Sequence, residues 1–286
     1  MNAVASVPIP RSVRRFLGVV LAVFLTIGFA GCQGASLLGV SVGEREDCLH
    51  HIIERGSLRV GVSGTQPPLN MKNAKGELIG LDIDLARALA AAMKVDLELI
   101  EMPFRSLIPA LETGEVELVI SSLTITPERN ARVAFAGPYL ISGSSLVTRA
   151  ELVQELDSVA ALNSAERSWA ALENSTGEAL ILDAFPLARL VTITDQEEAL
   201  ARVASGEIDG LVADQPFVEY AIVRNPGLAT LASPFTTEPL GVALHPESPL
   251  FANLVQNYLN TLDYTGQLMQ MKARWMSKGD WLGEMP

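Results

Sequence analysis

The chain has 286 residues, of which 49% are hydrophobic and 19% charged, and its formal net charge at pH 7 is −12. This length is enough for a sizeable core in one or two compact domains, and an acidic chain without a basic stripe is not expected to bind nucleic acid. His50 and His51 are neighbours on a predicted helix and point in different directions, and His245 is the third and last histidine. We therefore expect no metal site, no catalytic triad and no cofactor.

The first 31 residues have the pattern of a secretion signal. Arg11, Arg14 and Arg15 precede an apolar run, Phe16 to Gly31, which is shorter than the roughly 20 residues of a membrane span and typical of the apolar region of a signal peptide. The run ends in Phe29-Ala30-Gly31-Cys32, which resembles a bacterial lipobox. We predict that residues 1–31 are a lipoprotein signal peptide and that Cys32 is lipidated. A plain signal peptide or a short anchor helix is the alternative.

Residues 32–46 are rich in Gly, Ser and Ala, as expected of a flexible tether. A disulfide between Cys32 and Cys48, the two cysteines of the chain, is formally possible. Lipidation of Cys32 would instead leave Cys48 as a lone thiol on a predicted helix, where such a residue most often serves as a small buried side chain.

From residue 47 onwards, predicted helices and strands alternate. The spacing of apolar residues and the turn signals predict helices at 47–55, 81–93 and 107–111, and strands at 58–62, 97–101 and 118–120. This order of apolar strands and helices predicts a mostly parallel sheet that helices cover on both faces.

A second run of the same kind begins after residue 150. It predicts strands at 169–172, 191–193 and 210–213, helices at 177–184, 196–204 and 216–223, and a helical C-terminal segment at 250–278. Two α/β units with a cleft between them are the natural architecture for this pattern.

Several motifs follow one another in the order in which a known family has them. They are Leu58-Arg59-Val60-Gly61-Val62, Pro67-Pro68, Gly80-Leu81-Asp82-Ile83-Asp84-Leu85-Ala86, Leu107-Ile108-Pro109-Ala110-Leu111, Ser121-Ser122-Leu123-Thr124-Ile125-Thr126-Pro127-Glu128-Arg129, Ser175-Thr176-Gly177-Glu178 and Val212-Ala213-Asp214-Gln215-Pro216. Together they resemble the polar amino-acid-binding proteins of bacterial ABC transporters, extracellular solute-binding protein family 3, over about residues 47–280.

The resemblance implies the two-lobed type 2 periplasmic-binding-protein fold, an α/β fold in which each lobe is a mostly parallel sheet flanked by helices. Lobe 1 would be discontinuous, residues 47–145 plus 240–286, and lobe 2 would be residues 146–239. Two extended crossings, near 146–148 and 237–239, would form the hinge and close the lobes on a ligand.

The same resemblance implies a function. The protein would be an exported monomer, anchored through Cys32 at the extracytoplasmic face, that captures a free amino acid and delivers it to an ABC transporter permease. It would not be an enzyme.

A free amino acid needs a cation for its carboxylate and an anion for its ammonium. Arg129 is the expected cation, because a guanidinium meets a carboxylate in two parallel hydrogen bonds. By the resemblance, Ser122 and Thr124 help to hold that carboxylate, and Thr176 adds donors at the start of a helix. Asp214, at the end of a predicted strand, is the expected partner of the ammonium; its alternative role is to cap a helix.

Three further positions are expected to touch the ligand side chain. Phe104 matches an aromatic position that packs on it, although a core role is nearly as well supported. Thr65 stands where the family often has an acid, which argues against a basic ligand, and Leu69 stands where it often has an aromatic residue. Arg105 favours an acidic ligand if it reaches the pocket and a neutral or polar ligand if it faces solvent; we favour the latter.

Two other functions remain open on sequence grounds. The first is a cyclohexadienyl dehydratase, an enzyme of a similar fold that acts on arogenate or prephenate and needs a general acid. Glu178, Glu219 and Glu238 are candidates for that acid, and none stands out by spacing. The second is the ligand-binding domain of a sensor. In that role the chain would have to signal through a partner protein.

Overall fold

The computed structural model describes residues 48–277 and 280–284, which belong to one compact unit beginning at residue 47. The predicted signal peptide, Cys32 and the tether lie outside the described residues. Within the described ranges, no helix is both long enough and apolar enough to cross a membrane.

The first lobe is built on a five-stranded sheet with the order β5-β1-β6-β13-β7. Its strands are β1 (Ser57–Val62), β5 (Asp96–Glu101), β6 (Leu118–Val119), β7 (Ala134–Ser142) and β13 (Glu238–Leu244). β1 is parallel to β5 and β6, whereas β13 is antiparallel to both β6 and β7. Almost all of β1 is buried, because helices cover both faces of the sheet.

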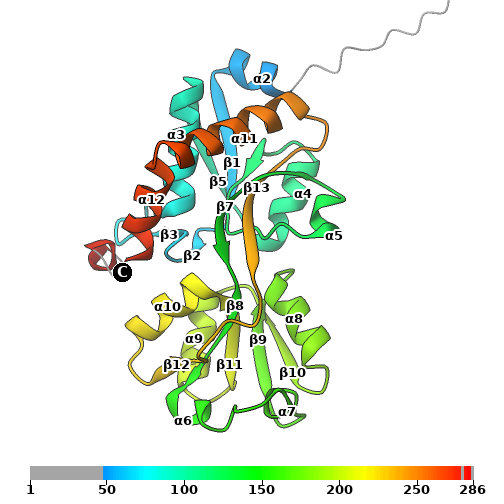
Figure 1. Cartoon of the computed structure of the whole chain (residues 1–286), viewed down its shortest axis with the longest axis vertical. Helices are drawn as coiled ribbons and strands as arrows, with labels where there is room; N and C mark the ends of the chain where they lie inside the picture. The colour runs from blue at the N-terminus through cyan, green and yellow to red at the C-terminus, as the bar shows by residue number, and fades with distance from the viewer. Residues whose placement is uncertain (1–47, 278–279, 285–286) are drawn as a thin grey trace, which may run out of the picture. The chain divides into compact units, whose positions relative to one another are not determined.

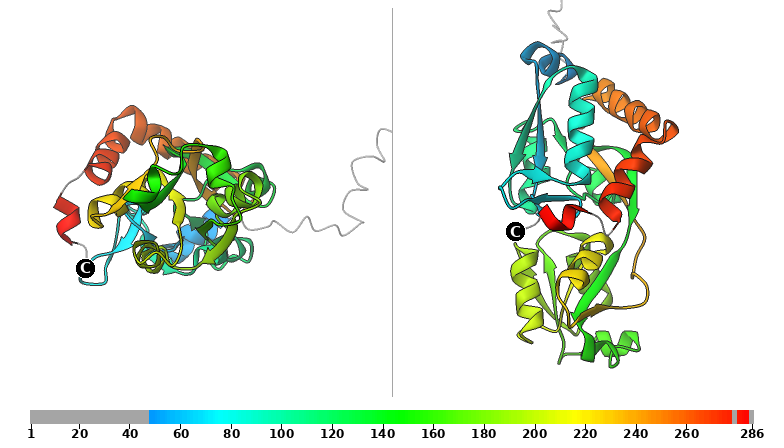
Figure 2. Two further views of the ribbon diagram at one scale, coloured as in Figure 1. Left: turned by 90° about the horizontal axis from the view of Figure 1, so that it is seen from below. Right: turned by 90° about the vertical axis from the view of Figure 1, so that its left-hand side faces the viewer.

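Helices surround this sheet (Figures 1 and 2). They are α2 (Cys48–Arg55), α3 (Leu81–Met93), η1 (Phe104–Ser106), α4 (Leu107–Glu112), α5 (Pro127–Asn130), α11 (Pro249–Tyr264), α12 (Gln267–Met276) and η2 (Asp280–Glu284). The helical segment predicted at 250–278 is two helices, because Gly266 adopts a left-handed φ of 73° between them. Trp275 on α12 is buried, and its indole N–H donates to Asp84 on α3 at 2.8 Å.

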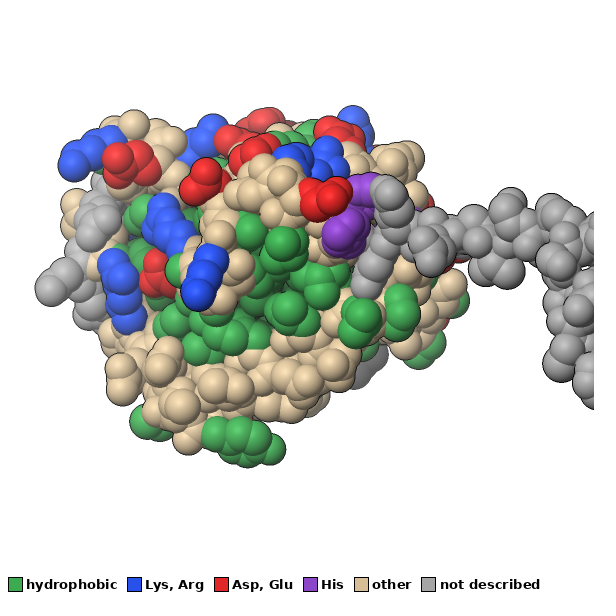
Figure 3. All heavy atoms as spheres, turned by 90° about the horizontal axis from the view of Figure 1, so that it is seen from above, with side chains coloured by type: hydrophobic (Ala, Val, Ile, Leu, Met, Phe, Trp, Pro, Cys, Tyr) green, Lys and Arg blue, Asp and Glu red, His purple; other side chains and the backbone are tan. Residues whose placement is uncertain are grey.

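A small antiparallel sheet lies beside the first lobe's main sheet, formed by β2 (Thr65–Gln66), β3 (Asn70–Lys72) and β4 (Leu78–Ile79). Seen from the end of the first lobe, the surface carries a group of hydrophobic side chains bordered by charged ones (Figure 3). Exposed large hydrophobic side chains of this lobe include Ile53 on α2 and Leu250 on α11.

The second lobe repeats the pattern of the first. Its sheet has the order β10-β9-β11-β8-β12, with β8 (Ser144–Arg149), β9 (Ser168–Leu172), β10 (Arg189–Ile193), β11 (Gly210–Asp214) and β12 (Leu228–Thr230). β9 is parallel to β10 and β11, and β8 is antiparallel to β11 and β12. Its helices are α6 (Ala150–Val153), α7 (Val159–Leu162), α8 (Thr176–Ala184), α9 (Gln196–Ala204) and α10 (Gln215–Arg224). In each sheet one strand, β13 or β8, runs against the other four, which share one direction. Each lobe is therefore a mostly parallel sheet flanked by helices, as predicted.

Two segments join the lobes, and they run side by side (Figure 1). One passes from β7 through Gly143 into β8, and the other leads from the second lobe into β13. Glu238 pairs with Ser142 in the ladder between β13 and β7. A Cβ atom on Gly143 would lie 2.2 Å from the carbonyl oxygen of Thr236, so only glycine fits where the two segments meet.

Candidate functional site

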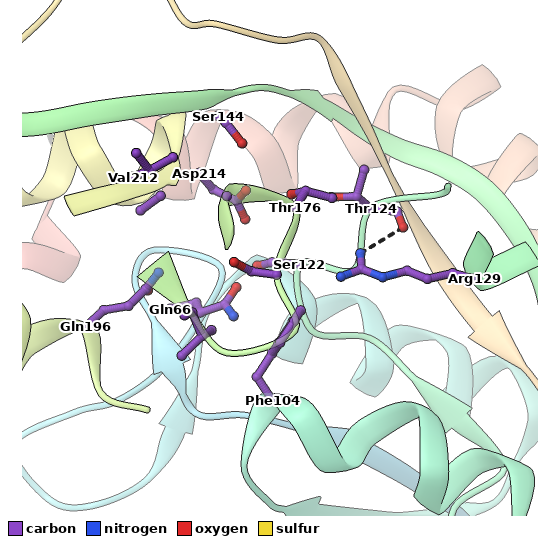
Figure 4. Close-up of a pocket in the computed structure, with 14 residues that line it drawn as sticks. Gln66, Phe104, Ser122, Thr124, Arg129, Ser144, Thr176, Gln196, Val212 and Asp214 are labelled. Atoms are coloured by element: carbon purple, nitrogen blue, oxygen red, sulfur yellow. Dashed lines mark hydrogen bonds between the residues drawn. The ribbon is translucent and has the colours of Figure 1, made fainter. Parts of the chain in front are cut away.

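A cavity of about 340 Å³, including its opening to solvent, lies between the lobes (Figure 4). Both lobes line it, with Gln66, Phe104, Ser122, Thr124, Arg129, Ser144, Leu172, Ser175, Thr176, Gly177, Gln196, Val212, Ala213 and Asp214. The structure thus brings together six of the eight residues predicted to contact a ligand. Thr65 and Leu69 are not among the lining residues.

Arg129 lies on the short helix α5, which begins with Pro127 and is capped by the Thr126 hydroxyl accepting from the N–H of Arg129 at 3.2 Å. Its guanidinium stacks over the Phe104 ring at 5.7 Å. It donates to the backbone oxygens of Thr124 at 3.0 Å and of Asn174, in the second lobe, at 2.9 Å. Burial lowers the pKa of Arg129, and Asp214 and Glu238 counteract it. The side chain stays a cation at any physiological pH.

Asp214 enters the cavity from the opposite lobe, at the carboxyl end of β11. It precedes α10, yet its side chain makes no capping hydrogen bond, so the alternative role of a helix cap is not the one observed. Burial raises the pKa of Asp214 to about 8, reinforced by the nearby charge of Glu238 and opposed by Arg129. The carboxylate thus lacks a sufficient counter-charge, and a bound cation would supply it.

Glu238, the first residue of β13, is held very differently. The residue is 5% exposed. Its carboxylate accepts four hydroxyl hydrogen bonds, from Thr124 at 2.8 Å, Thr176 at 2.7 Å, Ser144 at 2.6 Å and Thr236 at 2.7 Å. Burial raises the pKa of Glu238, but these hydrogen bonds, beginning with that of Ser144, bring it below the usual value. Glu238 therefore remains ionised at neutral pH and links the first lobe, the second lobe and both crossing segments.

This arrangement decides what two of the predicted ligand-binding hydroxyls can do. Thr124 and Thr176 donate their hydroxyl protons to Glu238. An ionised carboxylate only accepts, so neither proton is available to another acceptor. The oxygen atoms of Thr124 and Thr176 are left as acceptors towards the cavity.

Ser122 has a positive φ of 51°, an unusual conformation for a serine. Asp82 holds it there, because the Ser122 N–H donates to Asp82 Oδ2 at 2.9 Å. Asp82 is fully buried and also accepts from Tyr139 and Asn70, each at 2.7 Å. The Ser122 hydroxyl is buried and has no hydrogen-bond partner among the described residues, so it is available to a ligand.

Sequence reasoning did not single out Gln66 and Gln196, although both line the cavity. A glutamine carries no signal of burial in its sequence context, and the resemblance implies ligand contacts at the nearby Thr65 and Leu69 instead. Leu69 is 1% exposed and belongs to the hydrophobic core, and Thr65 lines a separate groove with Asp195 and Tyr220.

Arg105 does not line the cavity. It lies in a neighbouring hollow of the surface, where it forms an ion pair of 2.6 Å with Glu173 of the second lobe. Half of its side chain is exposed. The charge of Arg105 is thus paired with Glu173 of the other lobe and does not face the cavity.

The three glutamates considered as a general acid do not line the cavity either. Glu178 accepts from the N–H of Asn174 and the hydroxyl of Thr192, and Glu219 accepts from Gln215. Glu238 is kept ionised, which is the wrong state for an acid at neutral pH. Among the described residues, no group of three or more His, Cys, Asp and Glu side chains is placed to hold a metal.

Comparison with known proteins connects this geometry to a family. Residues 58–278 match the model of the bacterial extracellular solute-binding proteins, family 3. The ABC transporter arginine-binding protein 1 of Escherichia coli (strain K12) is 28% identical over 76% of this chain and 90% of the relative. The ABC transporter glutamine-binding protein GlnH of Bacillus subtilis (strain 168) is 25% identical over 90% and 95%.

A solved structure agrees. The crystal structure of an ancestral amino acid-binding protein, described as a precursor of cyclohexadienyl dehydratase, is 32% identical with a TM-score of 0.76, over 81% of this chain and all of the other. All three similar proteins are named for binding rather than for catalysis. The chain belongs to the bacterial extracellular solute-binding proteins of family 3, the amino-acid-binding proteins of ABC transporters.

Proposed function

We propose that this protein captures a free α-amino acid in the cavity between its lobes and delivers it to an ABC transporter permease. One observation carries the proposal. A cation on the first lobe, Arg129, and a carboxylate on the second that lacks a counter-charge, Asp214, line the same cavity. An α-amino acid presents one anion and one cation to match them.

The α-carboxylate would lie against Arg129, whose planar fork suits it. The first backbone N–H groups of α8, at Thr176 and Gly177, would complete the anion site, because a helix N-terminus carries unpaired donors and a partial positive charge. The hydroxyl of Ser122 is a further donor. Thr124, which the sequence suggested for the carboxylate, is assigned elsewhere.

The α-ammonium would pair with Asp214. The hydroxyl oxygens of Thr124 and Thr176 would accept its remaining protons, since their own protons are committed to Glu238. This gives the ammonium three acceptors, which equals its number of donors.

Capture would close the lobes about the two crossing segments.

The proposal also places the protein outside the cytoplasm, anchored through Cys32, with the permease as its partner. The names of the relatives, two ABC transporter amino-acid-binding proteins, support the transport role. Replacing Cys32 by Ala should release the protein from membranes in cell fractionation, and unchanged attachment would disprove the lipid anchor.

The binding test is a thermal-shift screen of the common amino acids, on purified protein that has been unfolded and refolded to remove any carried ligand. A ligand that binds only the folded state adds about 4 kcal/mol of stability at a thousandfold excess over its Kd. We expect a clear shift with one or a few amino acids, and none with the Arg129→Ala variant. If no amino acid shifts the wild-type protein, the proposed function is wrong.

A further inference from the structure

The wall of the cavity away from Arg129 carries two amide side chains (Figure 4). Gln66 comes from β2 in the first lobe, and Gln196 is the first residue of α9 in the second lobe. Each is 5% exposed. With Arg129 holding the α-carboxylate, this wall is where the side chain of a bound amino acid would end.

The amide oxygen of Gln196 is not satisfied within the described part of the chain. Gln196 Oε1 is buried without a hydrogen-bond partner among the described residues, and the buried Gln66 side chain lies on the same wall of the cavity. A buried amide without a partner costs about 1–3 kcal/mol. Gln196 is not needed as a helix cap, because Asp195 caps α9 by accepting from the N–H groups of Glu197 and Glu198 at 2.8 and 3.1 Å.

Charge narrows the class of side chain that fits. Among the described lining residues, only Arg129 and Asp214 are charged, and the α-carboxylate and α-ammonium use both. A cationic or anionic side chain would be buried against amides without an opposite charge, at a large cost in desolvation. Arg105, the nearby cation that might have received an acidic side chain, is paired with Glu173 outside the cavity.

We infer that the cavity selects an amino acid whose side chain ends in a neutral carboxamide, glutamine or asparagine, with Gln66 and Gln196 as the residues that determine this specificity. An amide offers both donors and an acceptor, so it meets the amides of Gln66 and Gln196 without introducing charge. The inference rests on the proposed function, since it assumes that Arg129 and Asp214 hold the α-groups.

Isothermal titration of the refolded protein tests it directly. We expect glutamine or asparagine to bind at least about tenfold more tightly than glutamate, arginine, lysine, histidine or alanine. Tighter binding of a charged amino acid, still lost in Arg129→Ala, would overturn the inference and leave the proposed function intact. If no amino acid binds, both fall.

A charge exchange provides the second test. Gln196→Glu places a carboxylate at the end of the side-chain site, so the preference should shift by at least about tenfold from the carboxamide ligand towards arginine or lysine. Gln66→Glu should do the same from the other lobe, and it serves if the first variant does not fold. Gln270→Glu, on an exposed position of α12, adds the same charge and should leave the preference unchanged. An unchanged ratio of affinities in both folded cavity variants would contradict the inference.

Discussion

Two carboxylates beside the same cavity are treated in opposite ways by the fold. Glu238, where the second crossing segment enters β13, receives four hydroxyl hydrogen bonds and has a lowered pKa. Asp214, at the end of β11, receives no capping bond, and its pKa is raised to about 8. The satisfied carboxylate organises the site, and the unsatisfied one is available to the ligand.

The difference shows that burial alone does not identify a binding residue. Glu238 is buried and Asp214 is partly buried, and for both residues burial is the largest influence on the pKa. What separates Glu238 from Asp214 is the supply of internal donors.

The largest expected effect is on binding in Asp214→Asn. Removing one partner of a buried charge pair costs about 2–5 kcal/mol, so affinity for the amino acid should fall by about 30- to 5,000-fold. The folding stability of the empty protein at pH 7 should rise, because the unfolded chain ionises Asp214 at that pH whereas the folded protein holds it largely protonated, a cost that asparagine does not carry. Titration calorimetry and urea unfolding measure the two quantities. Asp263→Asn, on an exposed position, is the control, and normal binding by Asp214→Asn would contradict the assignment.

Glu238→Gln should lower folding stability markedly and ligand affinity only moderately. An amide offers one acceptor oxygen where the carboxylate offers two, so some of the four hydroxyls lose their partner and unfolding free energy should fall by about 2–3 kcal/mol. Affinity should fall less than in Asp214→Asn, by about tenfold, through loss of orientation of Thr124 and Thr176. The urea midpoint and the Kd report these effects. A variant with the wild-type midpoint would show that the four hydrogen bonds contribute little.

The two carboxylates should also respond to pH in opposite directions. Because the folded pKa of Asp214 is raised, its contribution to stability is complete at low pH and is lost as the pH rises from about 4 through about 8. Glu238 has a lowered folded pKa, so its contribution is present at neutral pH and is lost in acid. Thermal unfolding of the empty wild-type protein against Asp214→Asn between pH 5 and 8 isolates the first effect.

Ligand affinity should follow the ionisation of Asp214. Below about pH 8 the carboxyl must lose a proton to pair with an ammonium, so affinity should rise by up to about tenfold per pH unit as the pH increases towards that value. The residual binding of Asp214→Asn should lack this dependence. A wild-type affinity that stays flat from pH 6 to 8 would argue against Asp214 as the ammonium partner.

The smallest effect is expected at the ion pair between Arg105 and Glu173. It joins the lobes but is largely exposed, and such pairs contribute about 0.2–1 kcal/mol. Arg105→Ala should weaken ligand binding by less than about fivefold, and high salt should remove the difference. Titrations of Arg105→Ala, Glu173→Gln and the double variant at low and high salt give the coupling. A large loss of affinity would mean that Arg105 acts on the ligand itself.

Local sequence patterns predicted much of the fold. The helices at 81–93 and 196–204 have the expected bounds, because apolar periodicity and neighbouring cap residues determine them within a few turns of chain. The strands β7, β8 and β13 were not predicted as such. Their pairing is antiparallel and, for β13 with β7, joins segments about a hundred residues apart, which no local pattern encodes.

The candidate site also contains residues that local sequence motifs predict and residues that only the tertiary structure brings together. Arg129, Asp214, Ser122, Thr124, Thr176 and Phe104 stand in motifs, and the structure places all six at the cavity. Their roles as ligand contacts stay predictions, as do the lobe limits. The four partners of Glu238 come from separate segments, so the sequence suggested only an isolated acid. Gln66, the neighbour of the predicted Thr65, lines the cavity, whereas Thr65 does not, because successive side chains of an extended segment point to opposite sides.

The glycine at position 143 has a mechanical consequence. The backbone of Gly143 packs against the Thr236 carbonyl with no room for a side chain. The two crossing segments are therefore packed against each other as one unit and are not two independent linkers. We expect such a pair of segments to bend together more readily than one segment can slide along the other. We therefore expect any closure of the lobes to follow a narrow range of directions, which would bring Asp214 to the same position opposite Arg129 each time.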